Sequence, residues 1–453
     1  MAWANKTAFF LLLTVIILTT LLYGGVHQPV LALFYLMIAA MVLLWTIDSY
    51  TTGLIRFSSS PLQLPIYAIA AYGLLQVIPF GVFDQAGVSN IPRTISVDPF
   101  STELNAFHFL ALGLFFSVTL VLLHRAQRIR KVVLAITVFG FVFAFFAILQ
   151  GVLSPTKIYG IYERQFAQPY GSFVNRHNFA AYMEMTIALP LGLLLTGAVR
   201  RDQRLLYLTA IVLMAVAMFL SGSRGGSVAL AAEAILVIIL TTPFRASRKL
   251  AVRLALGFVL TVAVVAGTIF VGGDSSLTRI AETASSQDIT TDRTHIWAVS
   301  LDVIRSNFPL GAGLGAFGTA YTRTDDRSGL ERVEQAHNDY LQAITDSGLV
   351  GAAIGGLFVY FLFRAARRGI GRNNKFRRGI AVGAAAGIFA VFVHSLFDFV
   401  LHTTAITLLF LLLAALLVAS GRRYDDDVHE SGSGQADRQG TPGALLAKLQ
   451  RRL

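Results

Sequence analysis

The sequence predicts an all-α integral membrane protein with about twelve transmembrane helices and one large outward-facing loop. Of its 453 residues, 55% are hydrophobic and only 14% are charged, a composition too apolar for a soluble domain. Hydrophobic runs of roughly 20 residues, the length that crosses a bilayer as a helix, recur along the chain. Basic residues gather in the short connections between alternate runs. These three observations place the chain in a membrane.

Twelve runs are long and apolar enough to be predicted as spans. They lie at 8–23, 29–47, 62–80, 104–123, 131–153, 177–199, 204–220, 225–242, 250–272, 348–366, 379–397 and 403–420. The first run follows Lys6 and has the look of a signal peptide. It ends in Leu-Leu-Tyr-Gly-Gly, without a small-x-small cleavage pattern, so we interpret it as a helix.

The distribution of basic residues predicts the orientation. Four connections on one side hold 18 Lys and Arg; they are 124–131, 200–204, 244–253 and 364–378. With Lys6, Arg56 and six more after Gly421, that side carries 26 of the 37 basic residues, which marks it as cytoplasmic. Both termini are therefore expected in the cytoplasm. Anionic membrane lipids account for the net charge of +12, so nucleic acid is not an expected partner.

The chain divides into four parts on this prediction. Residues 1–272 hold nine spans, 273–347 form the large outer loop, 348–420 hold three spans, and 421–453 form a polar cytoplasmic tail predicted to be disordered. Two shorter outward segments, 81–103 and 154–176, complete the outer face.

The large loop contains a predicted helix and a glycine-rich turn. Over 294–308, the residues Ile296, Val299, Val303 and Ile304 share one helical face, which favours a helix lying along the membrane surface. Glycines at 311, 313 and 315 follow. They favour a tight turn and a close approach of the backbone to a ligand.

The composition also limits the chemistry. The chain has no cysteine, which excludes disulfides, a thiolate nucleophile and cysteine-bound zinc. Its nine histidines are scattered, with no His-x-x-x-His pair. We therefore expect neither a metal site nor a cofactor.

Three arginines at the outer boundary are candidates for binding phosphate. Arg224 lies in Ser221-Gly-Ser-Arg-Gly-Gly226 at the start of a span, where the serines can cap the helix although a cation opposes the helix dipole. Free helix-end amides beside a guanidinium make a phosphate site. The alternative is an arginine that snorkels to lipid headgroups. Arg293, at the head of the loop helix, and Arg176, at the start of the sixth span, are placed similarly.

The densest polar cluster is Glu334-Gln-Ala-His-Asn-Asp-Tyr-Leu-Gln342, where helical spacing puts His337, Tyr340 and Leu341 on one face. A lone histidine is usually structural, but here a neutral His337 could take a proton from a sugar hydroxyl, with Asp339 or Glu334 to orient it. The supporting candidates are Asn338, Asp339, Tyr340 and Gln342, together with His394 and Asp398, which lie four residues apart and could pair or line one cavity. Glu184, inside the sixth span, is as consistent with a structural pair as with function. These features favour an outward cavity for an anionic, phosphate-bearing, lipid-linked substrate.

These residues resemble the motifs of the O-antigen ligase and polymerase superfamily of bacterial surface-polysaccharide enzymes. The resemblance covers about residues 170–400 and rests on Ser221–Gly226, Arg293 with Trp297, Pro309–Phe317, His337–Gln342 and Asp346–Gly351. It implies a membrane glycosyltransferase of the GT-C type that moves an undecaprenyl-diphosphate-linked glycan to an acceptor hydroxyl at the periplasmic face of the inner membrane. By this resemblance His337 activates the acceptor, and Arg224 and Arg293 hold the diphosphate. Arg176 is added from its position and charge.

The acceptor stays open at this stage. Ligases that join O-antigen to lipid A core, polymerases that extend a glycan, and protein O-oligosaccharyltransferases share these motifs. The charges nearly balance over 318–334, which favours a polymerase slightly over a ligase that must meet the anionic lipid A core. The alternative from another class is a transporter or flippase of lipid-linked glycans. We rank it lower because the polar residues gather on the outer side alone.

Overall fold

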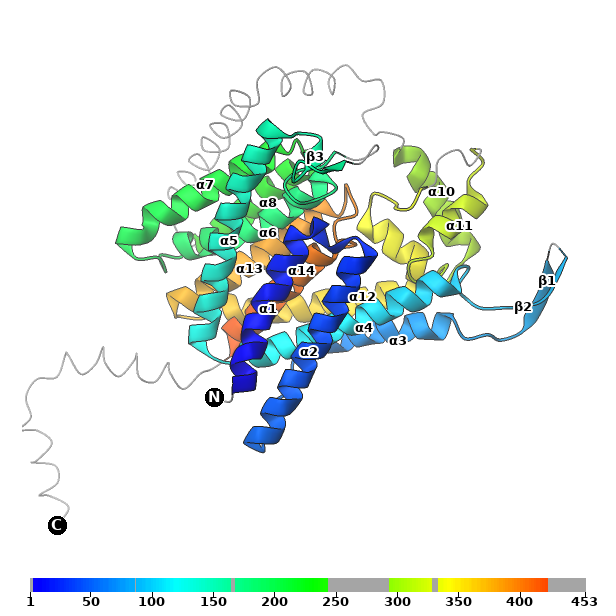
Figure 1. Cartoon of the computed structure of the whole chain (residues 1–453), viewed down its shortest axis with the longest axis horizontal. Helices are drawn as coiled ribbons and strands as arrows, with labels where there is room; N and C mark the ends of the chain where they lie inside the picture. Colours follow the sequence, from blue (N-terminus) through cyan, green and yellow to red (C-terminus); the bar gives the residue numbers. More distant parts are fainter. Residues whose placement is uncertain (1–2, 86, 164–167, 243–292, 328–332, 423–453) are drawn as a thin grey trace, which may run out of the picture. The chain divides into compact units, whose positions relative to one another are not determined.

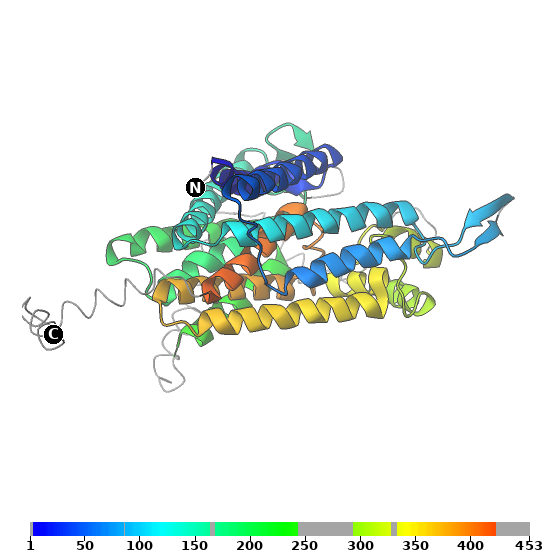
Figure 2. The same ribbon diagram turned by 90° about the horizontal axis from the view of Figure 1, so that it is seen from below.

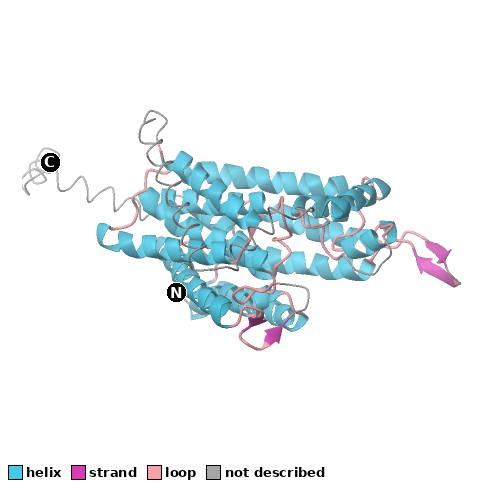
Figure 3. Cartoon of the chain, turned by 90° about the horizontal axis from the view of Figure 1, so that it is seen from above, coloured by secondary structure: helices cyan, strands magenta, loops and turns pink. Residues whose placement is uncertain are grey.

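Helices form almost all of the regular structure, because a helix satisfies every backbone polar group within one segment and so suits an apolar chain in lipid. The computed structural model describes residues 3–85, 87–163, 168–242, 293–327 and 333–422. Within this part of the chain the strands are confined to two small antiparallel pairs, β1 with β2 and β3 with β4 (Figure 3).

The elements follow one another in the order shown in Figure 1. The α-helices are α1 (Trp3–Leu21), α2 (Gln28–Thr52), α3 (Gln63–Gln76), α4 (Pro99–Leu122), α5 (Ala126–Leu153), α6 (Arg176–Leu195), α7 (Arg204–Leu220), α8 (Arg224–Thr241), α10 (Arg293–Ser306), α11 (Phe317–Thr324), α12 (Asp339–Ile370), α13 (Lys375–His394) and α14 (Thr404–Gly421). The short elements are η1 (Tyr23–Gly25), η2 (Arg201–Gln203), β1 (Val82–Gln85), β2 (Val88–Pro92), β3 (Lys157–Ile158) and β4 (Tyr162–Glu163).

Ten helices among the described residues are long and apolar enough to cross a membrane, which confirms the predicted fold class. The span predicted at 62–80 differs, because α3 has only 14 residues. At 1.5 Å per residue it covers about 21 Å, against roughly 30 Å of hydrocarbon. It ends three residues before Pro79, a residue that cannot continue a helix. The run at 250–272 lies outside the described residues.

One end of the helices carries the basic connections, and we call it the basic end. Arg128, in the first turn of α5, donates a hydrogen bond to the side chain of Asn5, whose amide donates to Asp48 near the end of α2. Arg378, at the start of α13, donates to the carbonyl of Leu240 at the end of α8. The predicted inner connections 124–131 and 364–378 therefore lie at one end.

The opposite end, which we call the site end, carries α10, α11 and the β1–β2 hairpin (Figure 2). Helices α3, α4 and α12 run side by side towards it. Ile296, Val299 and Val303 of α10 are buried against Phe317 and Tyr321 of α11, which confirms the helical face expected over 294–308. This small apolar core packs α10 against α11. We call residues 293–327, which contain both helices, the outer segment.

The glycine-rich turn packs closely on other parts of the protein: Gly311 on the backbone of α12, and Gly313 and Gly315 on side chains before and within α4. A Cβ atom on Gly311 would lie 2.5 Å from the carbonyl oxygen of Asp346. The amide of Gly313 donates to that same carbonyl at 2.9 Å, and Leu349 donates to the carbonyl of Pro309 at 2.9 Å. The turn therefore joins the outer segment to α12, which is itself broken at Gly348.

Candidate functional site

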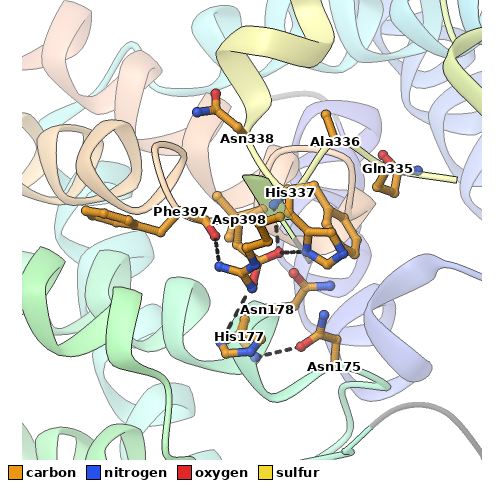
Figure 4. Close-up of polar contacts among 12 residues, drawn as sticks. Asn175, His177, Asn178, Gln335, Ala336, His337, Asn338, Phe397 and Asp398 are labelled. Carbon is orange, nitrogen blue, oxygen red and sulfur yellow. Dashed lines mark hydrogen bonds and ion pairs between the residues drawn. The ribbon is translucent and has the colours of Figure 1, made fainter. Parts of the chain in front are cut away.

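A single carboxylate organises the candidate site. Asp398 lies between α13 and α14, and its side chain is only 2% exposed. Its Oδ1 accepts a hydrogen bond from Nδ1 of His337 at 3.1 Å, and its Oδ2 lies 3.5 Å from a guanidinium nitrogen of Arg293. Nδ1 of His177, at the start of α6, lies 3.7 Å from the same Oδ2. Three segments distant in the sequence therefore meet at this carboxylate (Figure 4).

The charges around Asp398 keep it ionised. Burial alone would raise the pKa of this carboxyl. The hydrogen bond from His337 and the charges of His177 and Arg293 outweigh that effect, so the pKa of Asp398 falls well below its ordinary value. An ionised carboxylate fixes the tautomer of His337 with the proton on Nδ1, which leaves Nε2 free to accept.

The backbone beside His337 is held on both sides. The amide of Ala336 donates to the side chain of Gln342 at 2.9 Å, and the carbonyl of Ala336 accepts from the indole of Trp297 at 2.9 Å. His337 itself has φ 50°, in the left-handed region that non-glycine residues rarely occupy. The sequence predicted His337 within a helix, which was wrong, because α12 begins two residues later at Asp339.

The remaining candidates of the polar block hold this arrangement in place. Asn338 caps α12, accepting from the amides of Tyr340 and Leu341, and its own amide donates to the carbonyl of Leu396 at 3.2 Å. Tyr340 donates to the carbonyl of Phe392 at 2.7 Å. The bonds to Leu396 and Phe392 tie the start of α12 to the connection after α13 and to the end of α13.

Asp339 does not bond to His337 directly, the contact that one alternative drawn from the sequence required. Its carboxylate accepts from Nδ1 of His402 at 2.9 Å and from the hydroxyl of Ser395 at 2.7 Å. Sequence reasoning missed His402. The four-residue spacing between Asp398 and His402 was the available signal, but it lies in a connection without helical periodicity.

Arg293 and Arg224 differ in how far the protein occupies them. The guanidinium of Arg293 donates to the carbonyl of Phe397 and approaches Asp398, so part of its donor set is used. Arg224, the first residue of α8, is exposed, and its side chain has no hydrogen-bond partner among the described residues. Arg224 thus retains its full set of donors for an anion.

The start of α8 is built into the cluster. Ser223 caps α8 by accepting from the amide of Gly226, as the sequence predicted, and its hydroxyl oxygen also lies 2.9 Å from Nδ1 of His177. Arg224 is the next residue along the chain. His177 was noted in the sequence only as a neighbour of Arg176, whereas the structure places His177 beside Asp398. Arg176 is the half-buried first residue of α6, one position before it.

His394 does not pair with the side chain of Asp398. Nδ1 of His394 lies 3.0 Å from Oε1 of Glu184, and neither side chain is exposed. A Cβ atom on Gly225 would lie 3.0 Å from the ring of His394, so the glycine allows α8 to approach this pair. The Glu184–His394 pair links α6 to α13. This contact supports a structural role for Glu184.

One group of side chains in the described residues has the spacing of metal ligands. His295, Asp325 and Asp326 each offer a ligand atom, and these atoms lie within 4.8 Å of one another. His295 already bonds to Asp325 at 2.8 Å. The group belongs to the outer segment, and Asp326 is exposed, as acidic residues commonly are.

Comparison with known proteins identifies the family. Residues 209–355, about a third of the chain, match the family model described as O-antigen ligase. The matched segment includes Arg224, Arg293 and His337, but neither His177 nor Asp398. A search of curated proteins found no match.

The family match also indicates a class of function. It implies an enzyme of the O-antigen ligase or polymerase type in surface-glycan biosynthesis, which acts on a lipid-linked glycan and a glycan acceptor. The resemblance drawn from the sequence motifs is confirmed, because residues 209–355 of the chain are similar to the O-antigen ligase family.

Proposed function

We propose that the chain is a glycosyltransferase that moves a glycan from undecaprenyl diphosphate to an acceptor hydroxyl at the periplasmic face of the bacterial inner membrane. One observation carries the proposal: Asp398 bonds to Nδ1 of His337, while Nε2 of that ring has no hydrogen-bond partner among the described residues and the side chain is 32% exposed. A histidine oriented by a buried carboxylate, with its second nitrogen open, suits a general base.

The transfer step follows from this arrangement. Nε2 of His337 takes the proton of the acceptor hydroxyl, and the oxygen attacks the anomeric carbon of the glycan. The bond from that carbon to the diphosphate oxygen breaks, and the electron pair leaves with the lipid diphosphate. Asp398 stabilises the imidazolium that results, because its negative charge lies 3.1 Å from Nδ1. The proton then returns to solvent or to the departing diphosphate.

Arginines supply the charge that the leaving group needs. The departing diphosphate is strongly anionic, and preorganised cations lower the cost of its formation. Arg224 offers an unoccupied guanidinium beside the capped start of α8, and Arg293 lies against Asp398. We assign both to the diphosphate. We add Arg176 at the start of α6, a helix end that favours anions.

We also propose the orientation and the surroundings. The basic end would face the cytoplasm, in line with the 26 of 37 basic residues assigned to that side. The site end would then face the periplasm, where nucleotides are absent and a lipid-linked donor supplies the activated glycan. We also propose the four-part division of the chain, in which an outer loop lies between two groups of spans.

Turnover of a purified lipid-diphosphate-linked glycan in detergent tests the proposal. The wild-type protein should release undecaprenyl diphosphate and extend an added acceptor, whereas a flippase would release none. His337→Ala should reduce release by about 10²- to 10⁴-fold, the usual contribution of a general base. His295→Ala is the matched control, because His295 is also half-buried and also bonds to an aspartate. Equal losses in both variants would argue against His337 as the base.

For the acceptor we favour another glycan chain over lipid A core. Arg323 donates to the carbonyl of Val97, and His295 bonds to Asp325, so charges of the outer segment are partly used within it. Within 293–327 and 333–347, the described part of this region, no uncompensated basic surface is evident to attract an anionic lipid. Deleting the gene should then shorten surface glycans to single repeat units on their acceptor. Full-length chains accumulating on the carrier lipid would instead indicate a ligase.

A further inference from the structure

A second carboxylate–imidazole pair, Asp339 with His402, joins the same two segments as the pair of Asp398 with His337. The carboxylate of Asp339 accepts four hydrogen bonds, and it is only 7% exposed. The donors are the hydroxyl of Ser395 at 2.7 Å, the amide of Val400 at 3.0 Å, the amide of Leu401 at 3.2 Å and Nδ1 of His402 at 2.9 Å. All four belong to the connection between α13 and α14 that also carries Asp398.

The two pairs cross between the same two segments. In one, His337 donates to Asp398; in the other, His402 donates to Asp339. Each segment therefore contributes one acid and one histidine. The amide of Asp339 also donates to the carbonyl of Ser395 at 3.0 Å, so the segments are joined by backbone as well as by side chains.

We propose that Asp339 is a positioning residue for the catalytic pair, and that His402 is the side-chain partner that holds this buried carboxylate in place. On this proposal, the carboxylate of Asp339 fixes the 395–402 connection around itself. The fixed connection sets the place of Asp398, and Asp398 sets the ring of His337. The inference rests on the proposed function, because it concerns the geometry of the same base.

The electrostatics of His402 support this assignment. Burial lowers the pKa of an imidazole, but here the hydrogen bond to Asp339 and the charges of Asp339 and Asp346 outweigh it, so the pKa of His402 is raised. His108 of α4 is the other titratable group that interacts electrostatically with His402. The carboxylate of Asp339 is fixed in position by bonds from two backbone amides, a hydroxyl and an imidazole.

The position of Asp339 in the helix adds to this effect. It is the first residue of α12, directly after the cap Asn338. The exposed amides of a helix start favour a negative charge there. The side chain of His402 is 36% exposed, whereas Asp339 is nearly covered. In this pair, therefore, Asp339 is buried, whereas His402 is partly accessible.

A double-mutant cycle tests whether Asp339 acts through Asp398. Asp339→Asn should lower kcat for release of undecaprenyl diphosphate by about 10²-fold, the effect of a displacement near 1 Å. The KM for the donor should change little. The acid limb of the pH–rate profile should move to lower pH, because a displaced Asp398 stabilises the protonated ring of His337 less. In the background of Asp398→Asn, the same substitution should have almost no further effect.

Matched variants separate this role from a general loss of structure. Asp325→Asn breaks the other aspartate–histidine bond of similar length, at 2.8 Å, and should leave both kcat and the pH profile unchanged. If Asp339→Asn fails to insert in the membrane, Ser395→Ala removes one of the four bonds and should show a smaller shift in the same direction.

The outcomes distinguish this inference from the proposed function. If His337→Ala retains full turnover, the proposed function fails. If His337 is required but the losses from Asp339→Asn and Asp398→Asn are additive, with the acid limb in place, then Asp339 merely supports the fold and the inference is overturned.

Discussion

At the scale of the residue, Asp398 is one negative charge among an arginine and two histidines. Its pKa lies below the value of about 3.9 for an aspartate in an unfolded chain. A depressed pKa gives stability that is present above the unfolded value and lost only as the pH falls through the folded value. We therefore expect the melting temperature of the wild type to exceed that of Asp398→Asn from pH 8 to about 4, with the gap closing below that.

Thermal unfolding in detergent across this pH range provides the measurement. Asp202→Asn is a suitable control, because Asp202 is exposed at the basic end and its ion pair with Arg200 is also exposed. A gap that closed near pH 6 would mean that a histidine, rather than the carboxyl group, controls the difference.

Arg224 tests the assignment of the diphosphate. Arg224→Ala should raise the KM for the lipid-linked donor by about 10- to 100-fold, because hydrogen bonds to charged groups contribute about 1.5–3 kcal/mol. Arg224→Lys should restore only part of this, since lysine keeps the charge but loses the fork that holds two phosphate oxygens. A fully active lysine variant would favour contact with lipid headgroups instead. Steady-state kinetics with purified donor distinguishes the two.

Chelation tests the expectation that turnover needs no metal. The group of His295, Asp325 and Asp326 is the cation-ligand geometry found among the described residues, and it is separate from the cluster around Asp398. We expect EDTA, and the substitution Asp326→Ala, to leave release of undecaprenyl diphosphate unchanged. Loss of turnover on chelation, restored by a divalent cation, would contradict this.

The sequence predicted the types of residue in the site better than their partners. His337, Arg293 and Asp398 were all candidates, because charged and polar side chains at a membrane boundary need a reason. Their pairing was not predictable. His337 and Asp398 are 61 residues apart, and each had a nearer alternative, Asp339 for the histidine and His394 for the aspartate. Only the packing of α6, α12 and α13 decides between these options.

At the scale of the element, α12 shows a break that one glycine permits. Gly348 has φ 60° and ψ −153°, a conformation essentially restricted to glycine. A Cβ atom there would lie 2.1 Å from the carbonyl oxygen of Pro309. We expect Gly348→Ala to destabilise the protein by at least about 1–3 kcal/mol from backbone strain alone, and to disturb the outer segment.

Gly355→Ala provides the matched control in the same helix. Nothing lies within 4 Å of a Cβ atom at Gly355, so alanine should be neutral or slightly stabilising. The melting temperature of each variant and its amount in the membrane fraction give the comparison. Similar behaviour of both would mean that the break in α12 is not required.

Helical spans were predictable because length and hydropathy decide them, and the connections were not. The amphipathic face of α10 was identified correctly from its apolar spacing. The start of the span predicted at 348–366 was misplaced, because α12 begins at Asp339, nine residues before the apolar run at 348. The glycines of the 309–317 turn were interpreted as a ligand site, whereas Gly311 lies against the backbone of α12, and Gly313 and Gly315 lie against side chains before and within α4. Sequence spacing does not show what approaches a glycine.

At the scale of the whole molecule, orientation is the property that decides where the site works. The chain has no native cysteine, so single cysteines can be introduced without background. Ser89, exposed in β2 at the site end, and Gln203, exposed in η2 at the basic end, are suitable positions. An impermeant thiol reagent on intact spheroplasts should label the cysteine at 89 and spare the one at 203. The reverse pattern would place the site in the cytoplasm.

The gathering of distant segments at Asp398 has a consequence for the order of synthesis. His177 emerges from the ribosome far ahead of Arg293 and His337. Asp398, the carboxylate that joins them, follows α13 and lies just before α14, the last of the described helices. A nascent chain shorter than this holds cations and imidazoles without their counter-charge. We therefore expect glycan transfer to begin only after the connection between α13 and α14 has formed. An unfinished chain then does not consume the lipid-linked donor.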